Sequence, residues 1–343
     1  MSAKKIVVFG ELLMRLAPKG HERFLQAEAF DVRYTGAEAN AGVSLVNFGM
    51  EAYAVSKVPD NDIGQACVNY LSRFRLNTDF IARGGERLGL FYLETGAAQR
   101  SSKIIYDRAH SAIRGSQPGD YDWERICAGK DWFHFSGTAP ALGENVQRAL
   151  EDGVKAARKH GLTVSCDLNY RAKLWTPAEA GKVMAGLMRS VDVLIGNEED
   201  AEKVFGIKAE GSDVSTGRLP EESYKEVADR LVHRFGFRMV ATTLRESLSA
   251  SANGWRGLLF DGTRHFLSRR YEIAPVVDRV GSGDSFTGGL IYGILSGFDP
   301  QRSIEFAAAA SCLKHSIVGD FNLASVREVE ALMAGEASGR VQR

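Results

Sequence analysis

The residues best suited to chemistry lie in one glycine-rich stretch, residues 277–289, which runs straight into an apolar segment at 290–295. Gly281 and Gly283 lack a Cβ atom, so backbone N–H groups there can close around an anion. The start of a helix adds unpaired N–H groups and a partial positive charge. Asp284 follows at once with a carboxylate. An anion pocket with a base at its edge predicts phosphoryl transfer to a hydroxyl group.

A second interpretation of this stretch remains open. Gly-Ser-Gly-Asp before an apolar run is also an ordinary helix start, with Ser282 or Asp284 as its cap. The acidic run Asn197-Glu-Glu-Asp200 allows a similar choice, because its acids could cap a helix or could organise Mg²⁺ and its water shell beside phosphates. Thr243, at the end of a predicted strand, could lie beside a nucleotide or could simply lead out of the sheet. These stretches alone do not distinguish between the alternatives, so the other parts of the sequence are needed.

The chain has the composition of a globular protein. Its 343 residues are 44% apolar and 25% charged, which predicts a good core in one large domain or in a domain with an appendage. Its 43 basic residues balance 43 acidic ones, so the overall charge does not indicate nucleic acid or an anionic membrane as a partner. Four scattered cysteines without a C-x-x-C pair predict reduced thiols and a cytoplasmic protein. The apolar runs are too short for a signal peptide or a membrane-spanning helix.

Alternating strands and helices predict an α/β fold. They indicate a mostly parallel sheet with helices on both faces, where ligands bind at the carboxyl ends of the strands. Strands at 15–18 and 30–34 and a hairpin at 89–94 and 103–108 mix polar and apolar residues, which predicts a small separate sheet. The other predicted elements are strands at 6–10, 52–58, 132–136, 162–167, 191–196 and 239–243, short antiparallel strands within 249–271, helices opening at 35–42 and spanning 62–74, 144–160, 222–235, 284–296 and 301–317, and a surface loop at 206–222.

Several familiar motifs are absent from the sequence. Neither Gly-Lys pair is followed by Ser or Thr, which argues against a P-loop kinase. Without H-R-D or D-F-G the chain is not a protein kinase. The dinucleotide fingerprint fails because the first strand ends in a lone Gly10. Zinc-protease, nucleophile-elbow and paired-cysteine patterns are missing as well.

Together these pieces resemble the PfkB-type carbohydrate kinases, the ribokinase-like family, over nearly the whole chain. The most specific match is Asp278-Arg-Val-Gly-Ser-Gly-Asp284, which resembles the family signature D-T-x-G-A-G-D with arginine and serine as departures. The resemblance implies that Asp284 is the catalytic base, and that ATP and Mg²⁺ are used. It implies that Gly281, Ser282 and Gly283 form the anion hole. It also implies Asp278 as a candidate ligand for a monovalent cation such as K⁺.

Two shorter motifs resemble the same family. Thr35-Gly-Ala-Glu-Ala-Asn40 resembles its Gly-Gly-x-x-x-Asn substrate motif with Thr35 in place of one glycine, which implies Gly36 and Asn40 as substrate contacts. Asn197-x-x-Asp200 resembles its N-x-x-E motif with Asp in place of Glu. This match implies Asn197 as an ATP contact and Asp200 as a Mg²⁺ ligand acting through water.

The substrate is predicted from arginines and tyrosines. Ribokinase-like members usually place an Asp shortly after the first glycine to hold sugar hydroxyls, but residues 11–15 contain none. Arg108 and Arg171 could instead grip a carboxylate through a planar fork, which suits a sugar acid, or each could form a surface salt bridge. Residues 169–171, Asn-Tyr-Arg, and residues 314–322 resemble 2-keto-3-deoxygluconate kinases. The substrate contacts implied in this way are Gly36, Asn40, Tyr92, Tyr106, Arg108, Arg171 and Asp320.

The resemblance therefore implies ATP-dependent phosphorylation of the C6 hydroxyl of 2-keto-3-deoxygluconate in a kinase domain at 1–330, followed by a tail at 331–343. It implies that the small sheet, inserted at about 11–36 and 86–110, is a lid that also joins two copies of the chain. The predicted ATP contacts are Asn197, Thr243, Gly283, Ala308, Cys312 and His315. The open alternatives are a fructokinase or another ketose kinase, a non-catalytic sugar-acid-binding regulator and, more distantly, a nicotinamide oxidoreductase.

Overall fold

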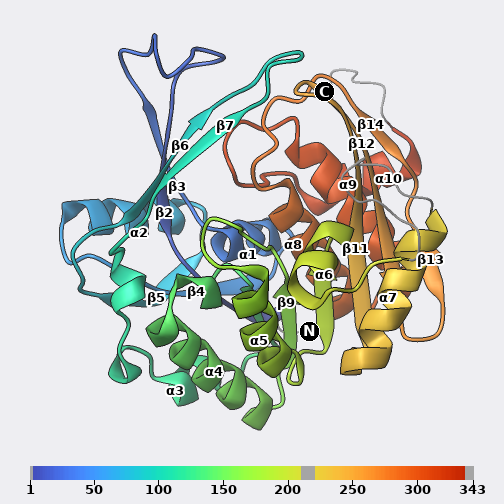
Figure 1. Cartoon of the computed structure of the whole chain (residues 1–343), viewed down its shortest axis with the longest axis horizontal. Helices are drawn as coiled ribbons and strands as arrows, with labels where there is room; N and C mark the ends of the chain where they lie inside the picture. The colour runs from blue at the N-terminus through green and yellow to red at the C-terminus, as the bar shows by residue number, and fades with distance from the viewer. Residues whose placement is uncertain (1–2, 210–220, 337–343) are drawn as a thin grey trace.

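A large central sheet organises the computed structural model, which describes residues 3–209 and 221–336 (Figure 1). Within these residues its strands lie in the order β13-β12-β11-β10-β9-β8-β1-β4-β5, with β14 paired to β12. Neighbours from β11 to β5 run parallel, whereas β12 pairs with β11, β13 and β14 in antiparallel fashion. The strands are β1 (Lys5–Phe9), β4 (Glu51–Val58), β5 (Asn77–Arg83), β8 (Trp132–Ser136), β9 (Thr163–Asp167), β10 (Val193–Gly196), β11 (Met239–Ser249), β12 (Ala252–Phe260), β13 (His265–Leu267) and β14 (Tyr271–Ile273).

Helices cover both faces of this sheet, which confirms the predicted three-layer α/β fold. Side chains alternate along each buried strand, so that Val7 and Phe9 join one core while Ile6 and Val8 join the other. The first core is closed by α3 (Trp123–Cys127), α4 (Glu144–Lys159), α5 (Pro177–Met188), α6 (Glu198–Phe205) and α7 (Glu221–Phe235). The second is closed by α1 (Ala37–Asn47), α2 (Asp62–Arg73), α8 (Ser282–Leu295) and α9 (Pro300–Lys314), and α10 (Val326–Ala334) packs on α9.

The predicted small sheet is also present. It contains β2 (Leu13–Ala17), β3 (Asp31–Thr35), β6 (Gly89–Glu94) and β7 (Lys103–Asp107) in the order β3-β2-β6-β7. The predicted hairpin is the antiparallel pair β6–β7, and β6 runs parallel to β2. In Figure 1 the strands of this sheet extend as an arm away from the main body. One face of the sheet therefore looks onto the carboxyl ends of the main strands, where the site lies.

Several elements differ from the predictions. Strand β5 and helices α3 and α5 were not expected, and β11 runs on to Ser249 because it forms a long hairpin with β12. Helix α10 crosses the predicted tail boundary at 330, because Ser325 and Glu328 form a capping box and Gly335 ends the helix. The predicted loop at 206–222 falls largely outside the described residues. Short 3₁₀ turns lie at Ala112–Gly115, Pro118–Asp120 and Pro140–Leu142.

Two further predictions concern membranes and cysteines. Among the helices of residues 3–209 and 221–336, none combines the length and apolar character that crossing a bilayer requires.

All four cysteines are free thiols, and burial raises the pKa of Cys67 and Cys127 to about 12. These thiols therefore stay protonated at neutral pH and are poor nucleophiles.

Candidate active site

A cavity of about 580 Å³ lies between the small sheet and the carboxyl ends of the parallel strands. Its floor carries residues at the ends of β9 and β10 and just after them, residues within β11, and the start of α8, and its roof carries residues of β2, β3, β6 and β7. This is the edge at which ligands bind in open α/β sheets. The predicted site residues that line the cavity are Gly36, Asn40, Tyr106, Arg108, Arg171, Asn197, Asp200, Thr243, Gly281, Ser282, Gly283, Asp284 and Asp320.

The glycine-rich turn enters helix α8 in a conformation that requires glycine. Gly281 has φ of 84°, and a Cβ there would lie 1.9 Å from the carbonyl oxygen of Asp320. A Cβ on Gly283 would meet no described atom within 4 Å, so packing does not require that glycine. No side chain in the described part of the chain caps the start of α8. The helix start thus offers its N–H groups and its positive end to an anion in the cavity.

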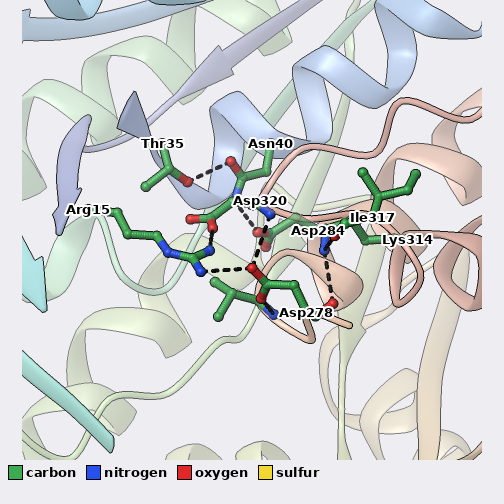
Figure 2. A network of polar contacts seen from close by, with 10 residues as sticks. Arg15, Thr35, Asn40, Asp278, Asp284, Lys314, Ile317 and Asp320 are labelled. Carbon is green, nitrogen blue, oxygen red and sulfur yellow. Dashed lines mark hydrogen bonds and ion pairs between the residues drawn. The ribbon is translucent and has the colours of Figure 1, made fainter. Parts of the chain in front are cut away.

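A chain of two hydrogen bonds orients the Asp284 carboxylate (Figure 2). The hydroxyl of Thr35 donates to Oδ1 of Asn40 over 2.8 Å, and Nδ2 of Asn40 donates to Oδ2 of Asp284 over 2.7 Å. The hydroxyl fixes which end of the amide faces Asp284, because only the NH₂ end can then donate to the carboxylate. Thr35, a departure from the family motif, therefore has a defined function in holding Asn40.

Burial and neighbouring carboxylates raise the pKa of several acids in the site. Burial raises the pKa of Asp284 to about 6, with Asn40 and Arg171 opposing the shift and Asp320 adding to it. Burial also raises the pKa of Glu38 to about 7, although Ser136 donates to it through both N and Oγ. For Asp167, burial and then the charges of Asp200 and Asp284 push the pKa well above its ordinary value. The cavity is therefore short of positive charge.

A buried ion cluster connects the small sheet to the signature turn (Figure 2). Arg15, on β2, donates through Nη1 to Oδ1 of Asp320 and through Nη2 to Oδ2 of Asp278 over 2.7 Å. Asp278 also accepts from the backbone N–H groups of Val280 and Gly319, each over 3.1 Å. Burial lowers the pKa of Arg15, but the charges of Asp320 and Asp278 outweigh it and the net shift is upward. Asp278 thus has a guanidinium partner, although it does not line the cavity.

The two arginines predicted to hold a carboxylate have different surroundings. Arg108 is buried and donates to Oε2 of Glu11 through Nε over 2.8 Å and through Nη2. Ser111 donates to the other oxygen of Glu11 over 2.5 Å. Arg171 is exposed at the rim, where its Nη1 donates to the backbone oxygen of Tyr170 over 3.2 Å. Arg108 therefore already pairs with a carboxylate of the protein, whereas the contact described for Arg171 is to a neutral carbonyl.

Asp200 has the surroundings expected of an indirect Mg²⁺ ligand. Its Oδ1 accepts from the N–H of Tyr170 over 3.0 Å, while its own N–H donates to the capping Asn197 over 2.8 Å. Burial raises the pKa of Asp200 to about 6, against the opposing charge of Arg171. Within the described residues no three metal-binding side chains converge. The buried Asp200 carboxylate at the edge of the cavity fits Mg²⁺, which keeps several waters and is held by one or two carboxylates together with phosphates.

Four of the predicted contacts lie away from the cavity. Tyr92 points to the opposite face of the small sheet from its neighbour Phe91, which lines the cavity, because successive residues of a strand alternate. On α9, Ala308 is fully buried in a core cluster, Cys312 packs against that cluster, and the buried His315 bonds the carbonyl of Ser311. The cavity lining contains none of these four residues.

Sequence reasoning missed Glu11, Arg15 and Glu38. Glu38 stands inside the Gly-x-x-x-Asn motif and Glu11 follows the first glycine, so both positions carried a signal. A Cβ on Gly10 would lie 1.9 Å from a carboxylate oxygen of Glu38, which explains why that glycine is needed. Arg15 gave no signal, because its partners lie about 260 and 300 residues away.

Comparisons with known proteins agree with this geometry. The profile described as pfkB family carbohydrate kinase matches residues 3–320, so the chain belongs to that family and is a sugar kinase. A crystal structure of 2-dehydro-3-deoxygluconokinase from Thermotoga maritima is 52% identical, with a TM-score of 0.93, over 97% of this chain and 99% of that one. A 2-dehydro-3-deoxygalactonokinase from Haloferax volcanii is 29% identical over 98% of each chain.

A more distant structure shows the fold in a nucleotide complex. An Escherichia coli protein solved with ATP and Mg²⁺ is 17% identical, with a TM-score of 0.80, over 97% of this chain and 100% of that one. Kinases of the pfkB family use ATP. The family membership confirms the predicted enzyme class and the predicted nucleotide.

Proposed function

We propose that the enzyme transfers the γ-phosphoryl group of ATP to the C6 hydroxyl of 2-keto-3-deoxygluconate (2-dehydro-3-deoxygluconate), giving the 6-phosphate. The observation that carries this proposal is the placement of Asp284 and the start of α8 in one cavity with an arginine at its rim. Asp284 can act as a base toward a hydroxyl group, and the start of α8 can bind a phosphoryl group. The arginine can bind the carboxylate of a sugar acid. The names of the Thermotoga and Haloferax relatives point to the same substrate class.

In this mechanism Asp284 accepts the proton of the C6 hydroxyl as its oxygen attacks the γ-phosphorus. The bond from that phosphorus to the bridging oxygen breaks, and ADP leaves with the electron pair. Asn40 holds one carboxylate oxygen of Asp284 and thereby directs the other toward the substrate. The N–H groups at Gly281–Gly283 bind the transferring oxygens, whose charge spreads in the transition state.

Magnesium fits beside Asp200 and supplies charge neutralisation for the ATP phosphates when bound. Burial raises the pKa of Asp200, and a cation bound nearby would favour its ionised form. We place the nucleotide against Asn197 and Thr243, which line the cavity. Contacts from Ala308, Cys312 and His315, and a monovalent cation such as K⁺ at Asp278, stay predictions of the family resemblance.

The sugar acid lies between the two sheets in this proposal. Gly36, Asn40, Tyr106 and Asp320 face its hydroxyl groups, and Arg108 and Arg171 face its carboxylate. Because Arg108 already pairs with Glu11, Arg171 is the one of these two arginines whose described contact is to a neutral carbonyl. The small sheet acts as a lid that keeps water from the phosphoryl group.

The cytoplasm stays the predicted location of the protein.

An ADP-release assay with Mg-ATP tests the substrate. It compares 2-keto-3-deoxygluconate, its galactonate epimer, fructose, ribose and adenosine with wild-type enzyme and with Arg171→Ala. We expect preferred turnover of a keto-deoxy acid and a KM for it that rises about 10- to 100-fold in the variant, with little change for fructose. Preferred turnover of fructose makes the enzyme a ketose kinase and contradicts the sugar-acid assignment. Binding of the acid without turnover identifies a non-catalytic regulator.

A further inference from the structure

Lys314, the last residue of α9, has an unusual environment. Its side chain is 0% exposed, and its ammonium donates to the backbone carbonyl of Asp278 over 3.0 Å and to that of Ile317 over 3.2 Å (Figure 2). Neither partner is a carboxylate. Buried lysines usually pair with an acid, as Lys57 does with Asp120 over 2.7 Å. Two carbonyl oxygens around a buried cation call for a different explanation.

The charge balance of the neighbouring cluster requires a cation at this place. Asp278 and Asp320 are both buried, and Arg15 supplies one positive charge for the two carboxylates. Burial lowers the pKa of Lys314, while the charges of Asp278 and Asp320 oppose that shift. With Lys314 neutral, the cluster would hold an uncompensated negative charge, which is costly in the protein interior.

The two carbonyls belong to the segments that shape the phosphate-binding turn. Asp278 begins the signature turn, and Ile317 begins the loop that leads to Gly319 and Asp320. The N–H of Gly319 donates to the Asp278 side chain, and the carbonyl of Asp320 lies against Gly281. The ammonium of Lys314 thus fastens the turn and the loop to each other just before α8 begins.

Backbone carbonyl oxygens are the ligands that replace water around K⁺ in proteins. We propose that the ammonium of Lys314 takes the place of the K⁺ that the family resemblance implies at Asp278: it occupies a carbonyl site beside the signature turn and makes the enzyme independent of dissolved K⁺. Lys314 is a positioning residue, because it acts through the turn and does not line the cavity. The activity readouts below rest on the proposed kinase function.

The first test needs no variant. Turnover of 2-keto-3-deoxygluconate with Mg-ATP is measured in KCl, NaCl and choline chloride at equal ionic strength. We expect the three values of kcat to agree within about twofold, since no dissolved monovalent cation is required. A rise of about tenfold or more in KCl over choline chloride overturns the proposal.

The second test removes the ammonium. In choline chloride we expect Lys314→Ala to lose about 100-fold in kcat, because the turn shifts relative to Asp284. KCl or NH₄Cl should restore about tenfold of that loss and raise the Tm of the variant by a few degrees, since the cation enters the vacated carbonyl site. Lys314→Met fills the same space with apolar atoms and should respond to neither salt. The matched control is Lys57→Ala, a buried lysine whose loss K⁺ should not repair.

The outcomes separate the two proposals. A Lys314→Ala enzyme with wild-type kcat and Tm in choline chloride overturns the role of Lys314, as does a loss that no cation restores. If that variant fails to fold, the salt comparison on the wild-type enzyme decides. If no sugar acid is phosphorylated at all, the proposed function fails, while the K⁺-dependent Tm of the variant still tests Lys314.

Discussion

At the scale of single residues, the ionised Asp284 carboxylate lowers the stability of the folded protein. Asn40 donates to it over 2.7 Å, but burial and the charge of Asp320 still raise its pKa to about 6. A raised pKa means that the folded protein holds this proton more tightly than the unfolded chain does. The ionised form, which the proposed mechanism uses as a base, is therefore the form that costs stability.

Replacing Asp284 by Asn should separate these two effects. We expect kcat to fall about 10²- to 10⁴-fold with a small change in KM, because the general base is lost while the shape is kept. Above pH 6 we also expect a gain of about 2 kcal/mol in unfolding free energy, reduced from the full pKa difference because the group opens onto the cavity. The gain should vanish below about pH 4, where the unfolded chain is protonated as well. Wild-type kcat in the variant would refute Asp284 as the base.

The same pKa predicts how activity depends on pH. We expect kcat/KM to fall as the pH drops through about 6, since the free enzyme then gains the proton that Asp284 must lack. In Asn40→Ala the carboxylate loses its donor, so the fall should move to higher pH. A pH–rate profile of both enzymes checks this, with Thr35→Val expected to lie between them. An unchanged midpoint in Asn40→Ala would show that another group titrates.

At the scale of elements, strand β2 is fixed to the main domain through Arg15. In Arg15→Met two buried carboxylates, Asp278 and Asp320, lose their partner. We expect a loss of about 3–5 kcal/mol in unfolding free energy, measured by urea denaturation. The control is Arg148→Met, whose exposed pair with Glu144 should contribute less than about 0.5 kcal/mol. Equal effects of the two substitutions would mean that the buried cluster does not hold the sheet.

The elements also show what sequence could predict. Buried strands such as β1 and β8 and the amphipathic α4 have strong patterns, and all three lie within a residue or two of their predicted bounds. Helix α10 was missed although Ser325 and Glu328 form a capping box, since its apolar pattern is short. Segments of the signature and of the two shorter motifs line the cavity. The charges that support them come from distant segments, so local patterns could not pair Arg15 with Asp320 or Arg108 with Glu11.

At the scale of the whole molecule, we predict that the outer face of the small sheet joins two copies of the chain. Val32, Leu16, Tyr92 and Ile105 lie side by side across its four strands, on the face away from the cavity. Val32 and Ile105 are 50% and 54% exposed. Leu16 and Tyr92 between them are half-buried, and a row of accessible apolar side chains of this kind favours an interface between two copies of the chain.

The interface predicts a change of mass in solution. We expect wild-type protein to be a dimer in light-scattering chromatography, and Ile105→Lys to be a monomer or a weaker dimer, because a charge would be buried at the contact. Ile63→Lys, at a 45% exposed apolar residue of α2 outside the small sheet, is the control and should leave the mass unchanged. A wild-type monomer at micromolar concentration would refute association through this sheet.

The distance along the chain between Arg15 and Asp320 has a consequence for synthesis. These partners are 305 residues apart, and Asn40 and Asp284 are 244 apart. At about 5–20 residues per second, a ribosome needs roughly 15–60 s between making Arg15 and making Asp320. Until then the guanidinium lacks its Asp320 partner, and Asn40 has no carboxylate to orient until Asp284 has been made. The proposed catalytic apparatus is therefore complete only once the last fifth of the chain, which holds Asp284 and Asp320, has been made.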